Sequence, residues 1–175
     1  TAKLSEVHIT DLTAWCNITF ENADSNPVNN RHWDSNVGRE VSPKFYINDE
    51  QMTNLVIPYD VTVIKPFAFF SFLHVKTITI HDNVTEIGSN AFEHCYDVNT
   101  VTIGSGVQSI GWFAFATMHN LATVYCKATT PPNGSGNPSI DGATEKIYVP
   151  NASTTAYRNA DGWRDYADYI WGKDF

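Results

Sequence analysis

The sequence lacks several features that assign a function directly. No run of apolar residues is long enough to cross a bilayer, and no segment matches a zinc-protease, serine-hydrolase, phosphate-loop or paired-cysteine motif. Positive charge is also scarce, because the 175 residues carry 11 Lys and Arg against 19 Asp and Glu, a net charge of −8. This balance repels phosphate backbones and anionic lipids, so the composition disfavours nucleic acid as a partner.

The sequence does contain a recurring motif. Ile87 to Cys95 reads IGSNAFEHC, and Ile110 to Met118 reads IGWFAFATM. An apolar-x-apolar triplet also recurs in steps of 23 residues, beginning at Leu55, Ile78, Val101, Val124 and Ile147. A constant period of this size predicts a solenoid, in which stacked coils bury side chains that no single coil can bury.

Each repeat combines two local patterns. The triplet alternates and predicts a short strand whose outer residues point inward. The Ala-Phe pair that follows the repeat Ile by four and five residues predicts a helical or 3₁₀ turn. The predicted fold class is therefore an α+β repeat solenoid: a leucine-rich-repeat-like right-handed coil with a 23-residue period, a ribbon of short parallel strands, and helical N- and C-terminal caps.

The chain reads as a single domain, residues 1–175, with four segments. Residues 1–50 do not follow the period and predict an N-terminal cap, with a helix from Leu12 to Ile18 and a strand entry into the first coil. Residues 51–126 hold the leucine-rich repeats, residues 127–150 a distorted, Pro- and Gly-rich last coil, and residues 151–175 a C-terminal helical cap.

Two expectations concern the C-terminal cap. Asn151 or Ser153 is placed to cap a helix that continues through Arg158. Trp163, Tyr166 and Ile170 have the spacing of an apolar helix stripe, and we expect them to seal the final coil.

Three cysteines cannot all pair within one chain, and their spacing fits neither a disulfide framework nor a zinc site. Cys95 occupies the position of Phe72 and Met118 in the adjoining repeats, and Cys126 occupies the position of a repeat Ile. We therefore expect buried thiols that act as small hydrophobic side chains, and the same role is favoured for Cys16.

The segments LVIPYDVTVI, ITIHDNVTEIGSNAFEHC and VTIGSGVQSIGWFAFATM, between Leu55 and Cys126, resemble the BspA-like leucine-rich repeats of Bacteroides-type surface proteins. The first coil departs from that pattern, with Lys65 and Pro66 where the others have Gly88 and Gly111 after the Ile. The resemblance implies a protein that is exported, displayed outside the cell or on its surface after removal of a signal segment, and adhesive toward host proteins or other cells.

The outward side of the strand ribbon is the first candidate binding surface. It is predicted to be a Thr-rich face that ends in two tyrosines, formed by Thr79, Thr102, Tyr125 and Tyr148 with Thr77 and Thr100 beside them. Aromatic side chains on rigid strands suit contacts with protein loops or sugars, although Thr and Tyr also pack well across strands for structural reasons alone. A second candidate patch is formed by Phe67, Trp112 and Phe113, which contribute only packing if they lie between coils.

These features predict a non-catalytic extracellular or cell-surface module that binds a protein partner through the strand ribbon. Neither a cofactor nor a metal is expected, since the six histidines share no repeat position and the acidic clusters lack a calcium-loop pattern. A glycan-binding module of a gut bacterium, using the same aromatic residues, is the alternative. An enzyme whose site is assembled from distant residues is a remote third.

Overall fold

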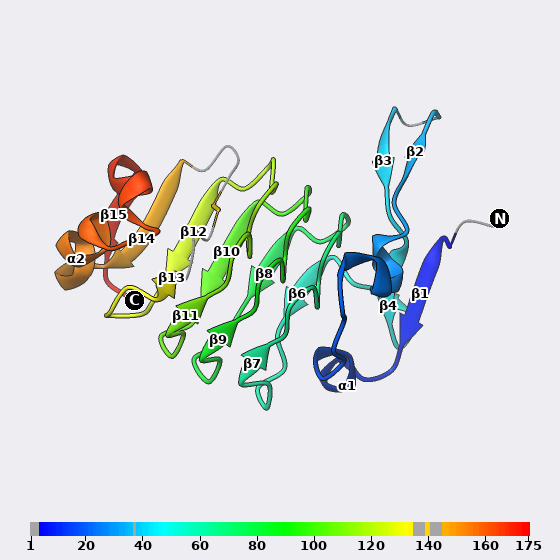
Figure 1. The fold of residues 1–175 in the computed structure, drawn as a ribbon, viewed down its shortest axis with the longest axis horizontal. Helices are drawn as coiled ribbons and strands as arrows, with labels where there is room; N and C mark the ends of the chain where they lie inside the picture. Colours follow the sequence, from blue (N-terminus) through cyan, green and yellow to red (C-terminus); the bar gives the residue numbers. More distant parts are fainter. Residues whose placement is uncertain (1–3, 37, 135–138, 141–144) are drawn as a thin grey trace.

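A computed structural model describes residues 4–36, 38–134, 139–140 and 145–175. Successive coils stack along one axis, with an irregular N-terminal segment at one end and α2 and β15 at the other (Figure 1). One six-stranded parallel sheet runs through the stack in the order β15-β14-β12-β10-β8-β6. Its strands are β6 (Asn54–Val56), β8 (Thr77–Thr79), β10 (Thr100–Ile103), β12 (Thr123–Cys126), β14 (Lys146–Pro150) and β15 (Ile170–Lys173).

The register of this sheet follows from the recurring triplets. Leu55 lies opposite Ile78, and Ile78 lies opposite Val101. Val101 pairs with Val124, which pairs in turn with Ile147. The five triplets thus lie side by side, because any other register would turn their apolar residues away from the core.

Below the sheet, inward side chains form columns that run from coil to coil. The rings of Phe69, Phe92 and Phe115 stack in parallel, with 5.5 Å between centroids and 5° between planes at both steps. All three rings are buried, and burial of one such side chain contributes about 2 kcal/mol. Each coil therefore depends on its neighbours for the burial of its aromatic residue.

A second parallel sheet lies on another side of the coils, in the order β13-β11-β9-β7. It consists of β7 (Val63–Ile64), β9 (Glu86–Ile87), β11 (Ser109–Ile110) and β13 (Asn133–Gly134). In three coils the repeat Ile is the last residue of a strand of this sheet, and its side chain is buried. The Ile-Gly motif therefore marks the end of a strand, which the sequence pattern does not predict.

The helical or 3₁₀ turn predicted over the Ala-Phe pair is wrong for the described coils, which have a series of turns there. Two positions in each coil adopt left-handed backbone, with φ between 56° and 63°: Phe67, Asn90 and Phe113 at the first, and Ser71, His94 and Thr117 at the second. Left-handed residues interrupt helical hydrogen bonding, and alternate N–H groups donate to the next coil instead. Examples are Phe69 N to Ala91 O at 2.8 Å and Phe92 N to Ala114 O at 2.9 Å.

The N-terminal segment closes one end of the stack with little helix. α1 (Leu12–Cys16) begins where predicted, with the Asp11 carboxylate accepting a hydrogen bond from Ala14 N, but it ends at Cys16 rather than Ile18. The Trp15 indole N–H donates to Ala68 O at 2.9 Å, and its ring packs edge-on against Phe45. The cap is thus an aromatic plug over the first coil.

Short strands and 3₁₀ turns make up the rest of the N-terminal segment. β1 (Glu6–Ile9) pairs in parallel with β4 (Lys44–Ile47), which forms a hairpin with β5 (Glu50–Gln51). The 3₁₀ turns are η1 (Ala23–Ser25) and η2 (Pro27–Asn29). A second hairpin, β2 (His32–Asp34) with β3 (Arg39–Val41), projects from the body of the molecule (Figure 1).

Two further predictions, both about the C-terminal cap, are wrong. Neither Asn151 nor Ser153 caps α2 (Thr154–Asn159) through its side chain, because the Ser153 hydroxyl donates to Thr129 O at 2.6 Å and the Asn151 amide to Asp174. Both residues lie in η3 (Asn151–Ser153), ahead of the α-helix.

Ile170 does not extend a helix stripe but begins β15, opposite Ile147. The chain resumes the repeat step here, because Ile147 otherwise has no strand neighbour on this side to bury it. Trp163 and Tyr166, on either side of the start of η4 (Arg164–Tyr169), do pack against the core. The seal therefore combines a strand with a short 3₁₀ helix.

All three cysteines are free and buried. Burial raises the pKa of the Cys16 and Cys95 thiols to about 12 and that of Cys126 to about 11. The Cys95 Sγ lies 3.2 Å from Phe69 O, and the Cys126 Sγ lies 3.2 Å from the Tyr157 hydroxyl. They are core side chains, as predicted.

Candidate functional site

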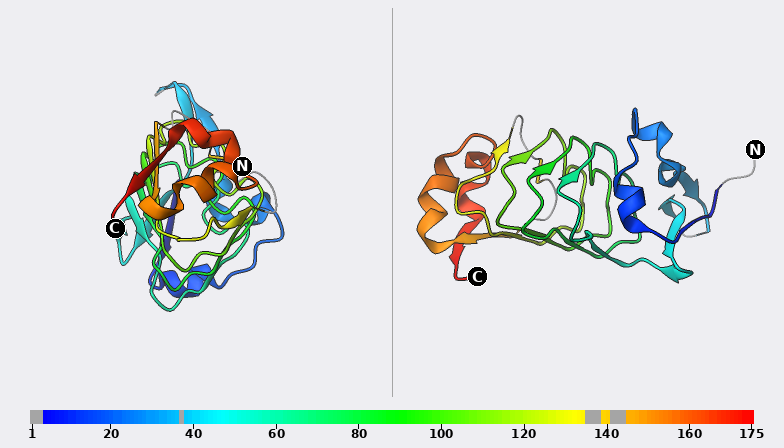
Figure 2. Two further views of the ribbon diagram at one scale, coloured as in Figure 1. Left: turned by 90° about the vertical axis from the view of Figure 1, so that its left-hand side faces the viewer. Right: turned by 90° about the horizontal axis from the view of Figure 1, so that it is seen from below.

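The outward side of the six-stranded sheet forms one continuous face. In the right-hand view of Figure 2 its strands line one side of the molecule. Strand register aligns one outward residue from each strand into a row, here called the ribbon row: Val56, Thr79, Thr102, Tyr125, Tyr148 and Trp171. Thr77 and Thr100 lie in the neighbouring row, where the Thr77 hydroxyl donates to Asn54 Oδ1 at 2.8 Å. The structure thus brings all six predicted ribbon residues onto one face.

Aromatic side chains gather at the C-terminal end of this row. The Tyr125 and Tyr148 rings stack with 5.3 Å between centroids and 12° between planes. The Lys173 Nζ lies 5.6 Å and 5.5 Å from the same two centroids, above the line between the rings. Trp171 is next in register and is 54% exposed, and the Phe175 ring meets Tyr125 edge-on. These five residues are called the aromatic end below.

Trp171, Lys173 and Phe175 are the members of the aromatic end that the sequence pattern does not predict. The helical spacing of Trp163 and Ile170 hides the strand that carries them. A usable signal exists nonetheless, because the repeat step from Tyr148 leads to Trp171, just as the step from Tyr125 leads to Tyr148.

The second candidate patch is divided. Phe67 is partly buried against the core and has its ring centroid 5.9 Å from that of Phe70. Trp112 and Phe113 are exposed, at 52% and 47%, and their ring centroids are 6.1 Å apart. Asn90 of the intervening coil separates Phe67 from Phe113, so the three residues do not form one surface.

Titratable side chains meet where the N-terminal segment contacts the coils. Arg31 donates to the Tyr96 hydroxyl at 3.0 Å and pairs with Glu40 at 3.1 Å, and the same hydroxyl lies 3.0 Å from His94 Nδ1. Burial, followed by the charge of Arg31, lowers the pKa of His94 to about 4, so this imidazole is neutral near pH 7. The cluster fastens the N-terminal segment to the coils through Arg31 and Glu40.

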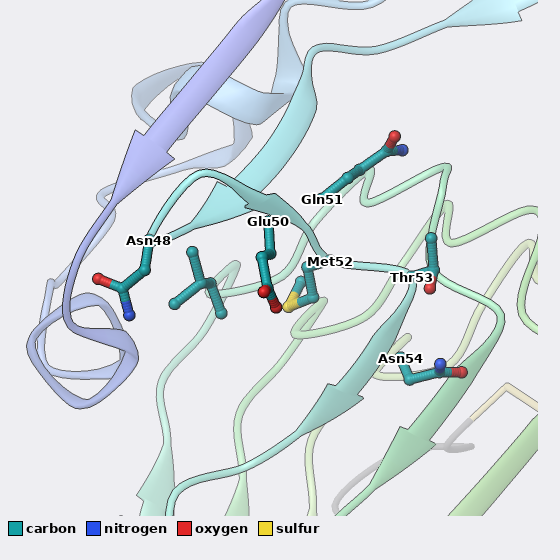
Figure 3. A pocket seen from close by; sticks show the side chains of 7 residues that line it. Asn48, Glu50, Gln51, Met52, Thr53 and Asn54 are labelled. Atoms are coloured by element: carbon teal, nitrogen blue, oxygen red, sulfur yellow. The ribbon is translucent and has the colours of Figure 1, made fainter.

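A hollow of about 460 Å³ lies beside the β4–β5 hairpin (Figure 3). Its lining comes from one stretch of chain, residues 47–54, and Glu50 is the one ionisable side chain of that lining. Within the described ranges, no three His, Cys, Asp or Glu side chains are grouped so as to hold a metal ion. The lining of the hollow offers no paired acid and base groups.

No helix in the part of the chain that the structure describes is both long and apolar enough to span a membrane.

Comparison with known proteins places this architecture in a family. The sequence model for the BspA type leucine rich repeat region matches residues 39–136, in six copies. Among solved structures, the chain is similar to a leucine rich cell surface protein from Faecalibacterium prausnitzii A2-165, with a TM-score of 0.50 and 18% identity over 83% of this chain. The match spans 41% of that protein's chain, so it shows the shared fold alone. No curated protein matches. Because the repeat model covers more than half of its residues, the chain belongs to the BspA type leucine-rich repeat family.

Proposed function

We propose that this chain is a non-catalytic interaction module, displayed at the cell surface, which binds a protein partner through the outward face of its six-stranded sheet. The family, and the likeness in fold to a protein described as a cell surface protein, support the surface setting. The single observation that carries the binding role is the aromatic end, where the half-buried Tyr125 and Tyr148 and the exposed Trp171 gather on strands whose other face is buried.

The two tyrosines of the aromatic end are largely ordered before a partner binds. Tyr125 and Tyr148 stand on strands whose inward residues, Val124 and Ile147, are fully packed, so their backbone is rigid before a partner arrives. The rings already stack on each other, which limits their rotamers. Binding therefore orders few new groups, and more of the contact energy appears as affinity.

The same stacking favours a protein over a glycan. A pyranose binds an aromatic ring by covering its open face, but the facing sides of Tyr125 and Tyr148 cover each other. Each ring thus keeps one face at most for a sugar, whereas the hydroxyl groups and the Lys173 amine beside the pair can bond to a polypeptide. Such groups complement the backbone and side chains of a polypeptide. Glycan binding remains the alternative that a glycan array decides.

The test compares two variants of the immobilised chain. Proteins captured by the wild type from surface extracts of host cells are identified by mass spectrometry, and their affinities are measured by biolayer interferometry. The double variant Tyr125→Ala/Tyr148→Ala should weaken binding by at least about tenfold, the equivalent of 1.4 kcal/mol. Tyr59→Ala is the matched control, because Tyr59 is 73% exposed but lies outside the ribbon row.

Unchanged affinity of the double variant, with an unchanged circular dichroism spectrum, would remove the ribbon row from consideration. Tight binding of a neutral glycan on an array, lost in the same variant, would replace the protein partner by a carbohydrate. Proteolytic shaving of intact source cells tests the location, since a surface module releases its peptides without lysis.

A further inference from the structure

The outward face of the six-stranded sheet carries no acidic residue, although the chain as a whole is acidic. Its burial patterns and register place thirteen side chains outward: Asn54, Val56, Thr77, Thr79, Thr100, Thr102, Thr123, Tyr125, Lys146, Tyr148, Pro150, Trp171 and Lys173. None is Asp or Glu, whereas the chain has 19 of these residues and a net charge of −8. The two charged members, Lys146 and Lys173, both lie at the C-terminal end.

Both lysines are free to accept a negative partner. Over the residues that the structure describes, neither lysine forms an ion pair, and the carboxylates next to them in the chain, those of Glu145 and Asp174, belong to residues outside the strands. Lys146 is exposed opposite Thr123 at the edge of the row. Lys173 is held beside Tyr125 and Tyr148, with its amine 5.6 Å and 5.5 Å from the two ring centroids.

The size of the positive region limits the kind of anion that fits. Charges act over about 8 Å at physiological ionic strength, so a narrow ligand that follows the sheet experiences mainly the local lysines. A nucleic acid duplex or an anionic bilayer is broad enough to meet the surrounding acidic surface as well, and the net charge of −8 repels it. The ring stack also leaves no open face between its two tyrosines for a pyranose.

We propose that the aromatic end and Lys146 bind an extended, acidic segment of a protein partner. Carboxylates of that segment pair with Lys146 and Lys173, and its apolar side chains pack on Tyr148 and Trp171. This assignment rests on the proposed function, since it names the chemistry of the partner at the same face. Long-range attraction to two unpaired lysines gives such binding a marked salt dependence.

The probe is a library of random 16-residue peptides displayed on phage, selected against the immobilised full chain at low salt. The charge of the enriched peptides is read from their sequences, and the affinities of three synthetic copies are measured by biolayer interferometry. We expect enriched peptides that carry several Asp or Glu residues. We also expect their affinity to fall about tenfold in Lys146→Gln/Lys173→Gln and on raising the salt from 50 to 300 mM.

Two controls separate this inference from the function on which it rests. Lys44→Gln removes an exposed lysine from β4, away from the ribbon row, and should leave the affinity unchanged. Trp171→Ala removes the exposed ring of the row without changing the charge and tests whether a peptide binds that face at all.

Neutral or basic peptides that lose binding in Trp171→Ala would overturn the acidic partner but leave the proposed function standing. No enriched peptide, or peptides that bind Trp171→Ala as well as the wild type, would overturn both. Polygalacturonate and phosphatidylserine vesicles are measured in the same format. Tighter binding of either than of the peptides would replace the polypeptide by an anionic glycan or lipid.

Discussion

Replacing Gly111 by Ala should destabilise the protein by more than its single methyl group suggests. A Cβ atom built on Gly111 lies 2.5 Å from Ser89 N and 2.8 Å from Gly88 C, in the backbone of the preceding coil. Ordinary contacts of a Cβ atom are 3.4–4 Å, so the two coils have to separate by about 1 Å. The separation also stretches the hydrogen bond from Gly111 N to Ile87 O, which is 2.8 Å long.

The expected loss in the free energy of unfolding combines three contributions. Overpacking of this kind costs about 1–3 kcal/mol, and a weakened backbone hydrogen bond about 0.5–1.5 kcal/mol. The reduced freedom of the unfolded chain returns about 0.4–1 kcal/mol when Gly becomes Ala. The expected net loss is about 2 kcal/mol in the free energy of unfolding. With a urea slope of about 2 kcal/mol per molar, the unfolding midpoint falls by about 1 M.

The first coil provides the matched control. Lys65 occupies the place of Gly88 and Gly111, but its neighbour is the N-terminal segment, where its amine donates to Asn17 O at 2.7 Å and Thr19 Oγ1 at 3.0 Å. Lys65→Ala removes these exposed contacts and should cost under about 1 kcal/mol. Urea titrations followed by circular dichroism at 25 °C compare the variants. If the urea midpoint of the Gly111→Ala variant equals or exceeds that of the wild type, close approach of the preceding coil is not the reason for Gly in the Ile-Gly motif.

Three further predictions follow from the core and the N-terminal contact. Phe92→Ala, which deletes a buried ring that stacks on a phenylalanine of each neighbouring coil, should cost about 4 kcal/mol in urea unfolding, and a loss below 2 kcal/mol would contradict the ring column. The native thiols should not react with Ellman's reagent at pH 8 but should all react in urea, since burial raises the pKa of each; rapid native labelling would contradict this for Cys16, Cys95 or Cys126. Burial holds the pKa of His94 near 4 in the folded protein, against 6.5 in the unfolded chain. The free energy of unfolding is therefore unaffected by protonation of His94 above pH 6.5 and decreases as the pH falls toward 4, because the unfolded chain binds the proton first. The charges of Arg31 and His119 also lower the pKa of His94, and that of Glu40 raises it. Between pH 7.5 and 4.5 the wild type should lose about 1 kcal/mol more than His94→Asn, a value reduced because the imidazole is partly exposed, and equal losses in urea titrations would contradict it.

The inward-facing residues of the coils could be predicted from the sequence because every coil has to bury the same kind of side chain against its neighbours. Ile78 and Val101 have to bury the same face against each other, and this fixes both their side-chain type and their register. The buried cysteines follow from the same reasoning. The left-handed turn positions do not, since Phe67, Asn90 and Phe113 share no side-chain property that marks their backbone. Hydrogen bonds between coils, rather than side chains, hold these residues in place.

The last strand shows where two sequence patterns compete. Trp163, Tyr166 and Ile170 have helical spacing, whereas Ile147 and Ile170 are one repeat step apart. The strand forms because β14 would otherwise present a free edge and leave Ile147 half covered, and pairing with β15 satisfies both its backbone and its side chain. The same step carries Trp171 and Lys173 onto the outward face, so an error in one element hides three of the five residues of the aromatic end.

The outward face is informative because stacking does not dictate it. Thr, Val or Ile at each outward position satisfies the preference of strands for β-branched residues, and the N-terminal half of the ribbon row follows that rule with Val56, Thr79 and Thr102. Strand preference also disfavours Asp, and it disfavours Glu and Lys to a lesser and similar degree. A face shaped by this preference alone would exclude charges of both signs. This one holds no carboxylate but retains Lys146 and Lys173 beside the aromatic side chains, and this difference in sign is the observation on which the proposed acidic partner rests.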